Sequence, residues 1–339
     1  MRQGRVFCIG EVVLDIIFSG DEPVAAKPGG SMLNTAVSLG RAGVPVHLIT
    51  TLASDRAGEL VFRFLQENNV FTDYIYRDTC GKTALALAFL DDRHDAEYTF
   101  YKDLPENPSG LRFPQIAEGD IFLFGSSFAL AGVMREALTT FLRMARGGGA
   151  FIIYDPNFRK SHLPDLEKVK PRIMENISLA NLVRGSDEDF NLVFAADSVA
   201  GAFEYVLQAG CPTLICTKNK DGVELLTSGL HLSLPAARID AVSTIGAGDA
   251  FNAGIIFALT PSGSSTLSGS STLSGSSTLS GSPTLSGSPT PSGSPTPSGC
   301  QWEAALQCGL QFSKNVCLSL DNYISVDFGN SMRLINQAG

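Results

Sequence analysis

The stretch STIGAGDAF at residues 243–251 decides how the rest of the chain is interpreted. Gly246, Ala247 and Gly248 stand directly before Asp249, and the apolar run AFNAGIIFAL follows from residue 250. This pattern predicts a turn that leads into a helix, with Asp249 in the first helical turn. One interpretation is structural, because an acidic side chain at that place caps free N–H groups and meets the positive end of the helix dipole.

The other interpretation of the same stretch is chemical. Backbone N–H groups that small residues leave uncovered at a helix N-terminus form a good site for phosphate. A carboxylate beside a bound phosphate can take the proton from an attacking hydroxyl group, as in phosphoryl transfer. The nine residues alone favour the helix cap, since short glycine motifs often match by chance. The rest of the chain has to distinguish the two interpretations.

The composition is that of a globular protein without a nucleic-acid or membrane partner. The 339 residues are 44% hydrophobic, which is enough for one large α/β domain or two ordinary ones. A formal net charge of -9 gives no broad basic surface for nucleic acid or an anionic membrane. The seven cysteines form no CxxC pair, so we expect reduced thiols in a cytoplasmic protein. Glu11 and Asp15 interrupt the N-terminal apolar run too early for a signal peptide or a membrane span.

One segment differs from the rest of the sequence. From Ser262 to Gly299 a six-residue unit repeats, SGSSTL changing to SGSPTL and SGSPTP. Such a composition has too little to bury to offset the entropy of ordering, so we expect residues 262–299 to be a flexible insert. Long surface insertions cost little closure entropy, and a dispensable loop is favoured over a phosphorylated or partner-binding segment. A helical pattern that starts near Trp302 rejoins the core.

Outside the insert, apolar runs alternate with amphipathic segments. Runs at 6–10, 46–53, 120–125, 150–155 and 213–217 predict buried strands, and segments at 31–43, 56–69, 133–147 and 198–210 predict helices. This order is typical of an α/β protein with a mainly parallel central sheet and helices on both faces. In such sheets ligands collect at the carboxyl ends of the strands.

Two further segments predict a second, smaller sheet. TALALAFLD at 83–91 alternates large apolar residues with alanines, and AEYTFYK follows at 96–102. Alternation at period two is typical of an antiparallel strand with one packed face. Together with VVLDIIFS at 12–19, these segments predict a lid built from about residues 12–27 and 83–104. A lid would exclude water from a reactive phosphoryl group.

Polar and glycine residues stand at the ends of the predicted strands. They are Asp15, Gly29, Gly30, Asn34, Asp155, Asn157, Arg159, Thr217 and Gly222. Each of them alone fits a turn, a bend or a helix cap better than a functional role. Because the strand ends meet at one edge of the sheet, the residues taken together favour a binding site.

The order of these motifs resembles that of the PfkB (ribokinase-like) sugar kinases over the whole chain except the repeat. GGSMLNTAVSLGRAG at 29–43 resembles the N-terminal signature of that family, and STIGAGDAFNAG at 243–254 resembles the C-terminal one. DPNFR at 155–159 and KNVCLSLDNY at 314–323 are similar to the fructokinase branch. The resemblance implies a ribokinase-like domain over residues 1–339 with a β-sheet lid, which uses ATP and Mg²⁺ to phosphorylate a sugar hydroxyl group.

By matched position, the resemblance implies a role for each candidate residue. Asp249 would be the general base, and the backbone of Gly246, Ala247 and Gly248 would form an anion hole for the transferred phosphoryl group. The sugar would contact Asp15, Gly30, Asn34, Asn157 and Arg159. The nucleotide would contact Thr217, Gly222 and Ser186. A homodimer formed through the lid is a further expectation.

Two candidate substrates and one competing class of protein stay open at this point. Fructose is the first candidate for the free sugar. An alternative is 2-keto-3-deoxygluconate, because Arg159 can pair a sugar-acid carboxylate bidentately, although the same side chain also suits the phosphate. The competing class is a catalytically inactive sugar-binding homologue, which the intact Gly-Ala-Gly-Asp sequence argues against.

Several positions depart from the family pattern. Ser243 replaces an Asp that helps to bind an activating monovalent cation, which makes K⁺ activation doubtful for this chain. The Asn-x-x-Glu motif linked to Mg²⁺ falls on Ser186 and Asp189, which leaves Asp189, or Glu188 beside it, to hold the metal through water. Asn219 stands where a glycine is expected two residues after Thr217.

Overall fold

The architecture is α/β, with a ten-stranded central sheet and a separate four-stranded sheet. The structure, a computed structural model, describes residues 4–90, 96–103, 110–260 and 297–338. The central sheet has the order β14-β13-β12-β11-β10-β9-β1-β4-β5, and β6 pairs with β4. Its pairs are parallel from β12 to β5 and antiparallel in the hairpins β12–β13 and β13–β14. The predicted fold class is confirmed.

The strands of the central sheet include all five that the apolar runs predict. Their bounds are β1 (Val6–Ile9), β4 (Val46–Ala53), β5 (Val70–Phe71), β6 (Ile75–Asp78), β9 (Ile121–Gly125), β10 (Phe151–Asp155), β11 (Leu182–Ser186), β12 (Thr213–Thr217), β13 (Val223–Thr227) and β14 (His231–Leu234). Sequence analysis missed β11, because Arg184, Gly185 and Ser186 break its apolar run. That polar strand end becomes important below.

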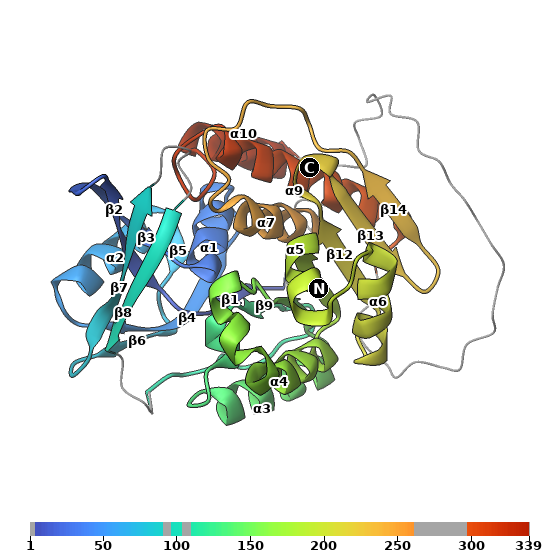
Figure 1. The fold of residues 1–339 in the computed structure, drawn as a ribbon, viewed down its shortest axis with the longest axis horizontal. Helices are drawn as coiled ribbons and strands as arrows, with labels where there is room; N and C mark the ends of the chain where they lie inside the picture. The colour runs from blue at the N-terminus through green and yellow to red at the C-terminus, as the bar shows by residue number, and fades with distance from the viewer. Residues whose placement is uncertain (1–3, 91–95, 104–109, 261–296, 339) are drawn as a thin grey trace.

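Helices cover both faces of the central sheet (Figure 1). They are α1 (Ser31–Arg41), α2 (Arg56–Glu67), α3 (Arg135–Gly147), α4 (Leu166–Leu179), α5 (Asp187–Phe194), α6 (Val199–Gln208), α7 (Ala247–Leu259), α9 (Gly299–Cys317) and α10 (Val326–Ala338). Within the described ranges, no single helix is long and apolar enough to cross a membrane. The bent pair of α5 and α6 passes that test only when the two helices are taken together, across a 60° bend.

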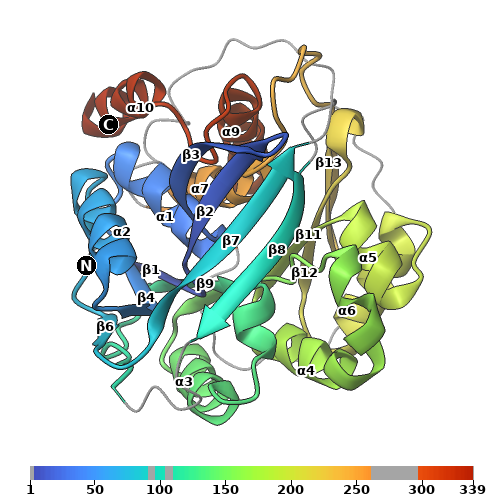
Figure 2. The ribbon, with the colours of Figure 1, turned by 60° about the vertical axis from the view of Figure 1, so that its left-hand side comes forward.

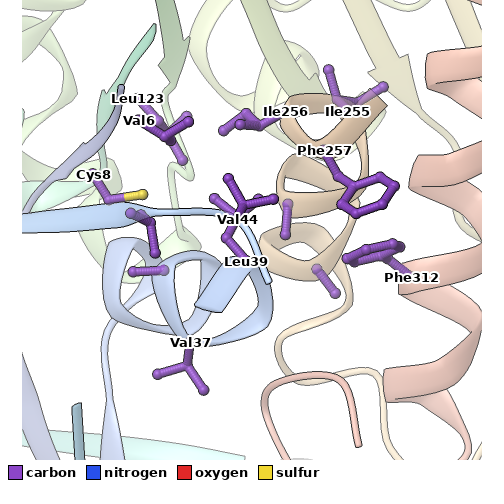
Figure 3. Packing of buried hydrophobic residues seen from close by; sticks show 14 of the residues in the cluster. Val6, Cys8, Val37, Leu39, Val44, Leu123, Ile255, Ile256, Phe257 and Phe312 are labelled. Atoms are coloured by element: carbon purple, nitrogen blue, oxygen red, sulfur yellow. The ribbon is translucent and has the colours of Figure 1, made fainter. Parts of the chain in front are cut away.

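The central sheet divides the hydrophobic core into two clusters, one on each of its faces. On β1, Val6 and Cys8 pack on the side of α1, α7 and α9, whereas Phe7 and Ile9 pack on the side of α3 and α4. This alternation follows from the period of two in a strand. Figure 3 shows the first of these clusters, where Phe257 of α7 and Phe312 of α9 lie against each other, with ring centroids 5.7 Å apart. Helix α7 is almost wholly buried between its neighbours.

The separate sheet is formed by β2 (Val13–Ser19), β3 (Glu22–Gly29), β7 (Lys82–Leu90) and β8 (Ala96–Asp103), in the order β3-β2-β7-β8 (Figure 2). The segments are close to those predicted for a lid. Strand β7 is antiparallel to β8, as its alternation predicts, but parallel to β2. Ala84, Ala86 and Ala88 face the packed side, which keeps this second layer thin.

The predicted insert at 262–299 falls almost entirely outside the described residues. Its last residues belong to the next helix, because Ser298 is the N-cap of α9. The Ser298 Oγ accepts a hydrogen bond from the Gln301 N–H at 3.4 Å, and Gln301 Oε1 accepts one from the Ser298 N–H at 2.8 Å. This capping box starts α9 at Gly299, so the helix start predicted near Trp302 is wrong by one turn.

Helices α7 and α9 lie close together at Gly254. A Cβ atom added there would lie 2.6 Å from the carbonyl oxygen of Cys308 and 2.7 Å from the Cα of Gly309. Both neighbours are backbone atoms, so neither can move without shifting a helix. The glycine therefore sets the spacing between the two helices.

We expect Gly254→Ala to lower the free energy of unfolding by about 1–3 kcal/mol, the usual cost of overpacking. Gly147→Ala in α3 is the matched control, because a Cβ there meets nothing within 4 Å. Helix propensity alone would stabilise both variants by up to about 1 kcal/mol. Urea unfolding of the two variants checks this, and equal stability of both would contradict the close approach.

Candidate active site

One pocket gathers predicted site residues from distant parts of the sequence. It is lined by Asp15 and by residues of the α1 start, the β10 end and the α7 start, and the predicted residues among them are Asp15, Gly30, Asn34, Asn157, Arg159, Gly246 and Asp249. The structure therefore places every predicted sugar contact beside the predicted base. Ala247 and Gly248 belong to the same turn but do not line the pocket.

Asp249 directs its carboxylate toward α1. It stands in the first turn of α7, where Oδ1 accepts a hydrogen bond from Ser31 Oγ at 2.6 Å and Oδ2 accepts one from Asn34 Nδ2 at 2.8 Å. Thr35 Oγ1 donates to the main-chain oxygen of Asp249 at 2.9 Å. Both carboxylate oxygens thus have donors on another helix, an arrangement that the helix-cap interpretation does not require.

The protonation of Asp249 follows from these surroundings. Burial raises its pKa to about 6, although the hydrogen bonds from Ser31 and Asn34 favour the charged form and lower the pKa. The charge of Asp155 adds to the rise, and that of Arg159 opposes it. A carboxyl group with this pKa is charged at neutral pH and close to the range in which a general base works best.

The turn before Asp249 requires glycine at residue 246 and brings Gly248 close to a side chain. Gly246 has φ +78°, and a Cβ there would lie 2.2 Å from the carbonyl oxygen of Asn322. A Cβ at Gly248 would lie 2.8 Å from Arg184 Nη1. The Ala247 N–H donates to the Thr244 carbonyl oxygen at 3.2 Å. The first N–H groups of a helix have no acceptor within that helix, and of these the Ala247 N–H is already bonded inside the turn, whereas Gly246 and Asp249 line the pocket.

Two polar side chains in the pocket suit a ligand with hydroxyl groups. Asp15 is 7% exposed on β2, and burial raises its pKa to about 7, against the opposing charge of Arg159. Asn34 Oδ1 is buried and has no hydrogen-bond partner in the described part of the chain. Both groups can accept a hydrogen bond from a hydroxyl, and a buried acceptor without a donor is costly.

Asp155 fixes the loop after β10. It is 1% exposed, and its Oδ1 accepts a hydrogen bond from the Asn157 N–H at 3.0 Å. Its Oδ2 accepts from Arg184 Nη1 at 3.0 Å and from Asn252 Nδ2 at 2.6 Å. Sequence analysis missed Arg184 and Asn252. The available signal for Arg184 was a charged residue directly after the short apolar run of Leu182 and Val183.

The predicted nucleotide residues lie away from this pocket. Thr217 ends β12, and its Oγ1 accepts a hydrogen bond from Arg184 Nη2 at 2.9 Å. Gly222 has φ +93° in the β12–β13 hairpin, where a Cβ would lie 2.1 Å from the carbonyl oxygen of Leu234. A second pocket lies next to them, lined in part by Cys216, Lys218, Asn219 and Glu224.

The predicted metal residues have partners of their own. Asp189 Oδ1 accepts from the Phe158 N–H at 2.6 Å, and Oδ2 accepts from the N–H and Oγ of Ser186, both at 2.7 Å. Ser186 and Asp189 thereby form the capping box of α5. Glu188 is more accessible and pairs with Lys160 at 3.0 Å. No group of three or more His, Cys, Asp or Glu side chains among the described residues could hold a metal ion.

The separate sheet closes one side of the first pocket. Lys102 of β8 pairs with Glu11 Oε2 at 2.7 Å, and Ser127 Oγ donates to the same oxygen at 3.0 Å. Phe100 and His162 also line this side. These residues were not predicted, because the contact between Glu11 and Lys102 joins segments 91 residues apart.

Comparisons with known proteins agree with the fold. A model of the pfkB family of carbohydrate kinases matches residues 3–268. The chain is 28% identical over 262 residues to probable fructokinase-4 of Arabidopsis thaliana. The aligned region covers 74% of this chain and 80% of the relative. The crystal structure of aminoimidazole riboside kinase from Salmonella enterica, complexed with aminoimidazole riboside and an ATP analogue, matches with a TM-score of 0.78 at 21% identity, over 98% of this chain and 100% of that one. Fructokinase from Vibrio cholerae, bound to fructose, ADP and a calcium ion, matches with a TM-score of 0.68 at 21% identity, over 76% and 84%.

We expect Ser31→Ala to raise the pKa of Asp249, because it removes a donor that stabilises the charged form. Thr35→Val is the matched control, since the Thr35 hydroxyl bonds the backbone of Asp249 rather than its carboxylate. The titration can be followed by NMR of ¹³C-labelled aspartate carboxyl groups. A raised pKa of Asp249 in Thr35→Val, with an unchanged pKa in Ser31→Ala, would contradict the assigned hydrogen bonds.

Proposed function

Because the chain belongs to the pfkB family of carbohydrate kinases, which are ATP-dependent sugar kinases, we propose that it phosphorylates fructose with Asp249 as the general base. The observation that carries this proposal is the buried Asp249 carboxylate, which faces the pocket and is held by Ser31 and Asn34. The fructokinase relatives, at about 28% identity, support fructose as the sugar.

In the proposed reaction, Asp249 takes the proton from the attacking hydroxyl group of the sugar. Its pKa of about 6 leaves it charged at neutral pH and ready to accept that proton. The turn of Gly246, Ala247 and Gly248 presents the N-terminus of α7 to the charge that develops on the transferred phosphoryl group. The base and these donors belong to one helix, which fixes their relative positions.

The other hydroxyl groups of the sugar would bind Asp15, Gly30 and Asn34. Asn157 and Arg159 would lie near the phosphate and the acceptor end. Asn34 supports this role, because its Nδ2 serves Asp249 and its Oδ1 is left for a ligand. The sheet of β2, β3, β7 and β8 would act as the lid over this site, held to the core by Lys102 and Glu11.

The nucleotide would lie along Thr217, Gly222 and Ser186, beside the second pocket. The family uses a divalent cation, and we propose Mg²⁺, which usually binds through phosphates, waters and one or two carboxylates. When bound, it neutralises charge on the phosphates. Glu188 suits this role better than Asp189, whose oxygens already accept three hydrogen bonds. Ser243 Oγ accepts a hydrogen bond from the Ile245 N–H at 3.2 Å and, being neutral, lacks the charge that the family's Asp offers a monovalent cation.

A homodimer through the lid is also part of the proposal. Val24 of β3 and Tyr101 of β8 are 59% and 57% exposed, at opposite edges of the lid sheet. Exposed apolar side chains of this kind can take part in an interaction surface.

A second substrate candidate is 2-keto-3-deoxygluconate, because Arg159 lines the pocket and a guanidinium group pairs a carboxylate bidentately. We expect kcat/KM to be higher for fructose than for the keto-deoxy acid. Coupled detection of ADP with a panel of sugars, at fixed ATP and Mg²⁺, measures this preference. Phosphorus NMR of the product then identifies the phosphorylated hydroxyl group. If no sugar releases ADP above background, the chain is a binding protein and the proposed function is wrong.

Asp249→Asn should lower kcat by at least about two orders of magnitude, because an amide does not accept the hydroxyl proton. The variant keeps the size of the side chain, so nucleotide affinity and the circular dichroism spectrum should stay near those of the parent. Asp165→Asn, at the N-cap of α4 without a side-chain capping bond, is the control for the substitution itself. If Asp249→Asn turns over close to the parent rate, Asp249 is a helix cap and not the general base.

A further inference from the structure

Three buried carboxylates lie close together at the edge of the central sheet. Asp155, Asp189 and Asp249 are 1%, 8% and 8% exposed. Asp155 and Asp189 accept hydrogen bonds from the neighbouring N–H groups of Asn157 and Phe158, and Asp155 also bonds Asn252, three residues after Asp249 on α7. A nucleotide that binds at this edge brings further negative charge. The edge therefore needs a positive group to offset the carboxylates.

Arg184 is the buried cation at this place. It is 7% exposed at the end of β11, where Nη1 donates to Asp155 Oδ2 at 3.0 Å and Nη2 donates to Thr217 Oγ1 at 2.9 Å. One side chain thus joins Asp155, at the end of β10, to Thr217, the predicted nucleotide contact at the end of β12.

The guanidinium group also lies against the first turn of α7. A Cβ at Gly248 would lie 2.8 Å from Nη1 and 3.1 Å from Nη2, and the centroid of the Phe251 ring is 5.4 Å from Cζ. Arg184 Nε is buried and finds no hydrogen-bond partner in the described ranges. A cation with one N–H group that has no partner among the described residues therefore lies against Gly248 of the predicted anion-binding turn.

Stability does not explain why an ion pair is buried here. Taking two charges out of water usually costs about as much as their attraction returns, and well-packed neutral replacements are often equally stable. The position of the pair gives a better reason, since it lies between the anion-binding turn and Thr217.

We propose that Arg184 is a positioning residue of the phosphate subsite, which neutralises Asp155 beside the first turn of α7 and holds Thr217 in place. The proposal rests on the proposed function, because it takes the anion to be the phosphate groups of ATP. Without Arg184, the charge of Asp155 would repel each phosphate that approaches this edge.

The test measures nucleotide binding rather than turnover. Dissociation constants of adenosine, ADP and a non-hydrolysable ATP analogue are determined by calorimetry for the parent and for Arg184→Met. We expect adenosine affinity to stay within about threefold, the ATP analogue to bind at least about thirtyfold more weakly, and ADP to fall between them, because unpaired charge acts on charged ligands. Equal losses for adenosine and the ATP analogue, or no loss at all, would overturn the proposal.

The double variant Asp155→Asn/Arg184→Met removes both charges together. We expect it to bind the ATP analogue within about tenfold of the parent, since a neutral pair leaves no uncompensated charge. This variant also decides the outcome if Arg184→Met alone fails to fold. If the double variant keeps its affinity for adenosine but loses its affinity for the ATP analogue, charge balance is not the role of Arg184.

Arg135→Met is the matched control. Arg135 of α3 is another largely buried guanidinium group, paired with Glu175 outside both pockets. We expect Arg135→Met to change the affinities for adenosine, ADP and the ATP analogue by the same small factor. A loss of affinity that grows with the number of phosphates in this variant would count against the proposal. The proposed function is tested separately: if the parent phosphorylates no sugar, that function fails, whereas the graded loss of nucleotide binding would still stand.

Discussion

A charged carboxylate in a buried place needs donors, and this need determines how α1 and α7 meet. Asp249 is 8% exposed, and both donors to its carboxylate come from the first turn of α1. Thr35, one residue further along α1, binds the backbone beside it. Because the bonds reach the side chain and the main chain of one residue, the helices cannot rotate or slide without breaking several at once. The pocket is built around this junction.

The same requirement appears at the other strand ends. Asp155 is satisfied by Asn252, Arg184 and the Asn157 N–H, so one side chain links β11, α7 and the loop after β10. Asp189 ties the start of α5 to Phe158 in that loop. The edge of the sheet is thus held by polar contacts, whereas its interior is held by apolar packing. Such contacts hold a site in place more exactly than packing alone, since hydrogen bonds are directional.

The sequence was informative where local pattern decides structure. The five strands, the helices at α1, α2, α3 and α6, and the second sheet follow from periodicity alone. The pocket contacts were predicted because strand ends converge on one edge. Ser31, Arg184 and Glu11 were not, since their roles depend on partners 218, 29 and 91 positions away in the chain. Asp189, a candidate metal ligand in sequence, also caps α5, a role that its bonds to Ser186 reveal and the sequence did not predict.

The start of α9 has a consequence for the history of the chain. Each unit of the repeat begins with Ser-Gly, and the final Ser-Gly pair, Ser298 and Gly299, provides the N-cap and first residue of α9. Loss or gain of whole units by slippage during DNA replication would always leave the same pair in front of Cys300. The helix would then begin with an identical cap at any copy number. Length variation in this tract is therefore shielded from the folded core at its C-terminal junction.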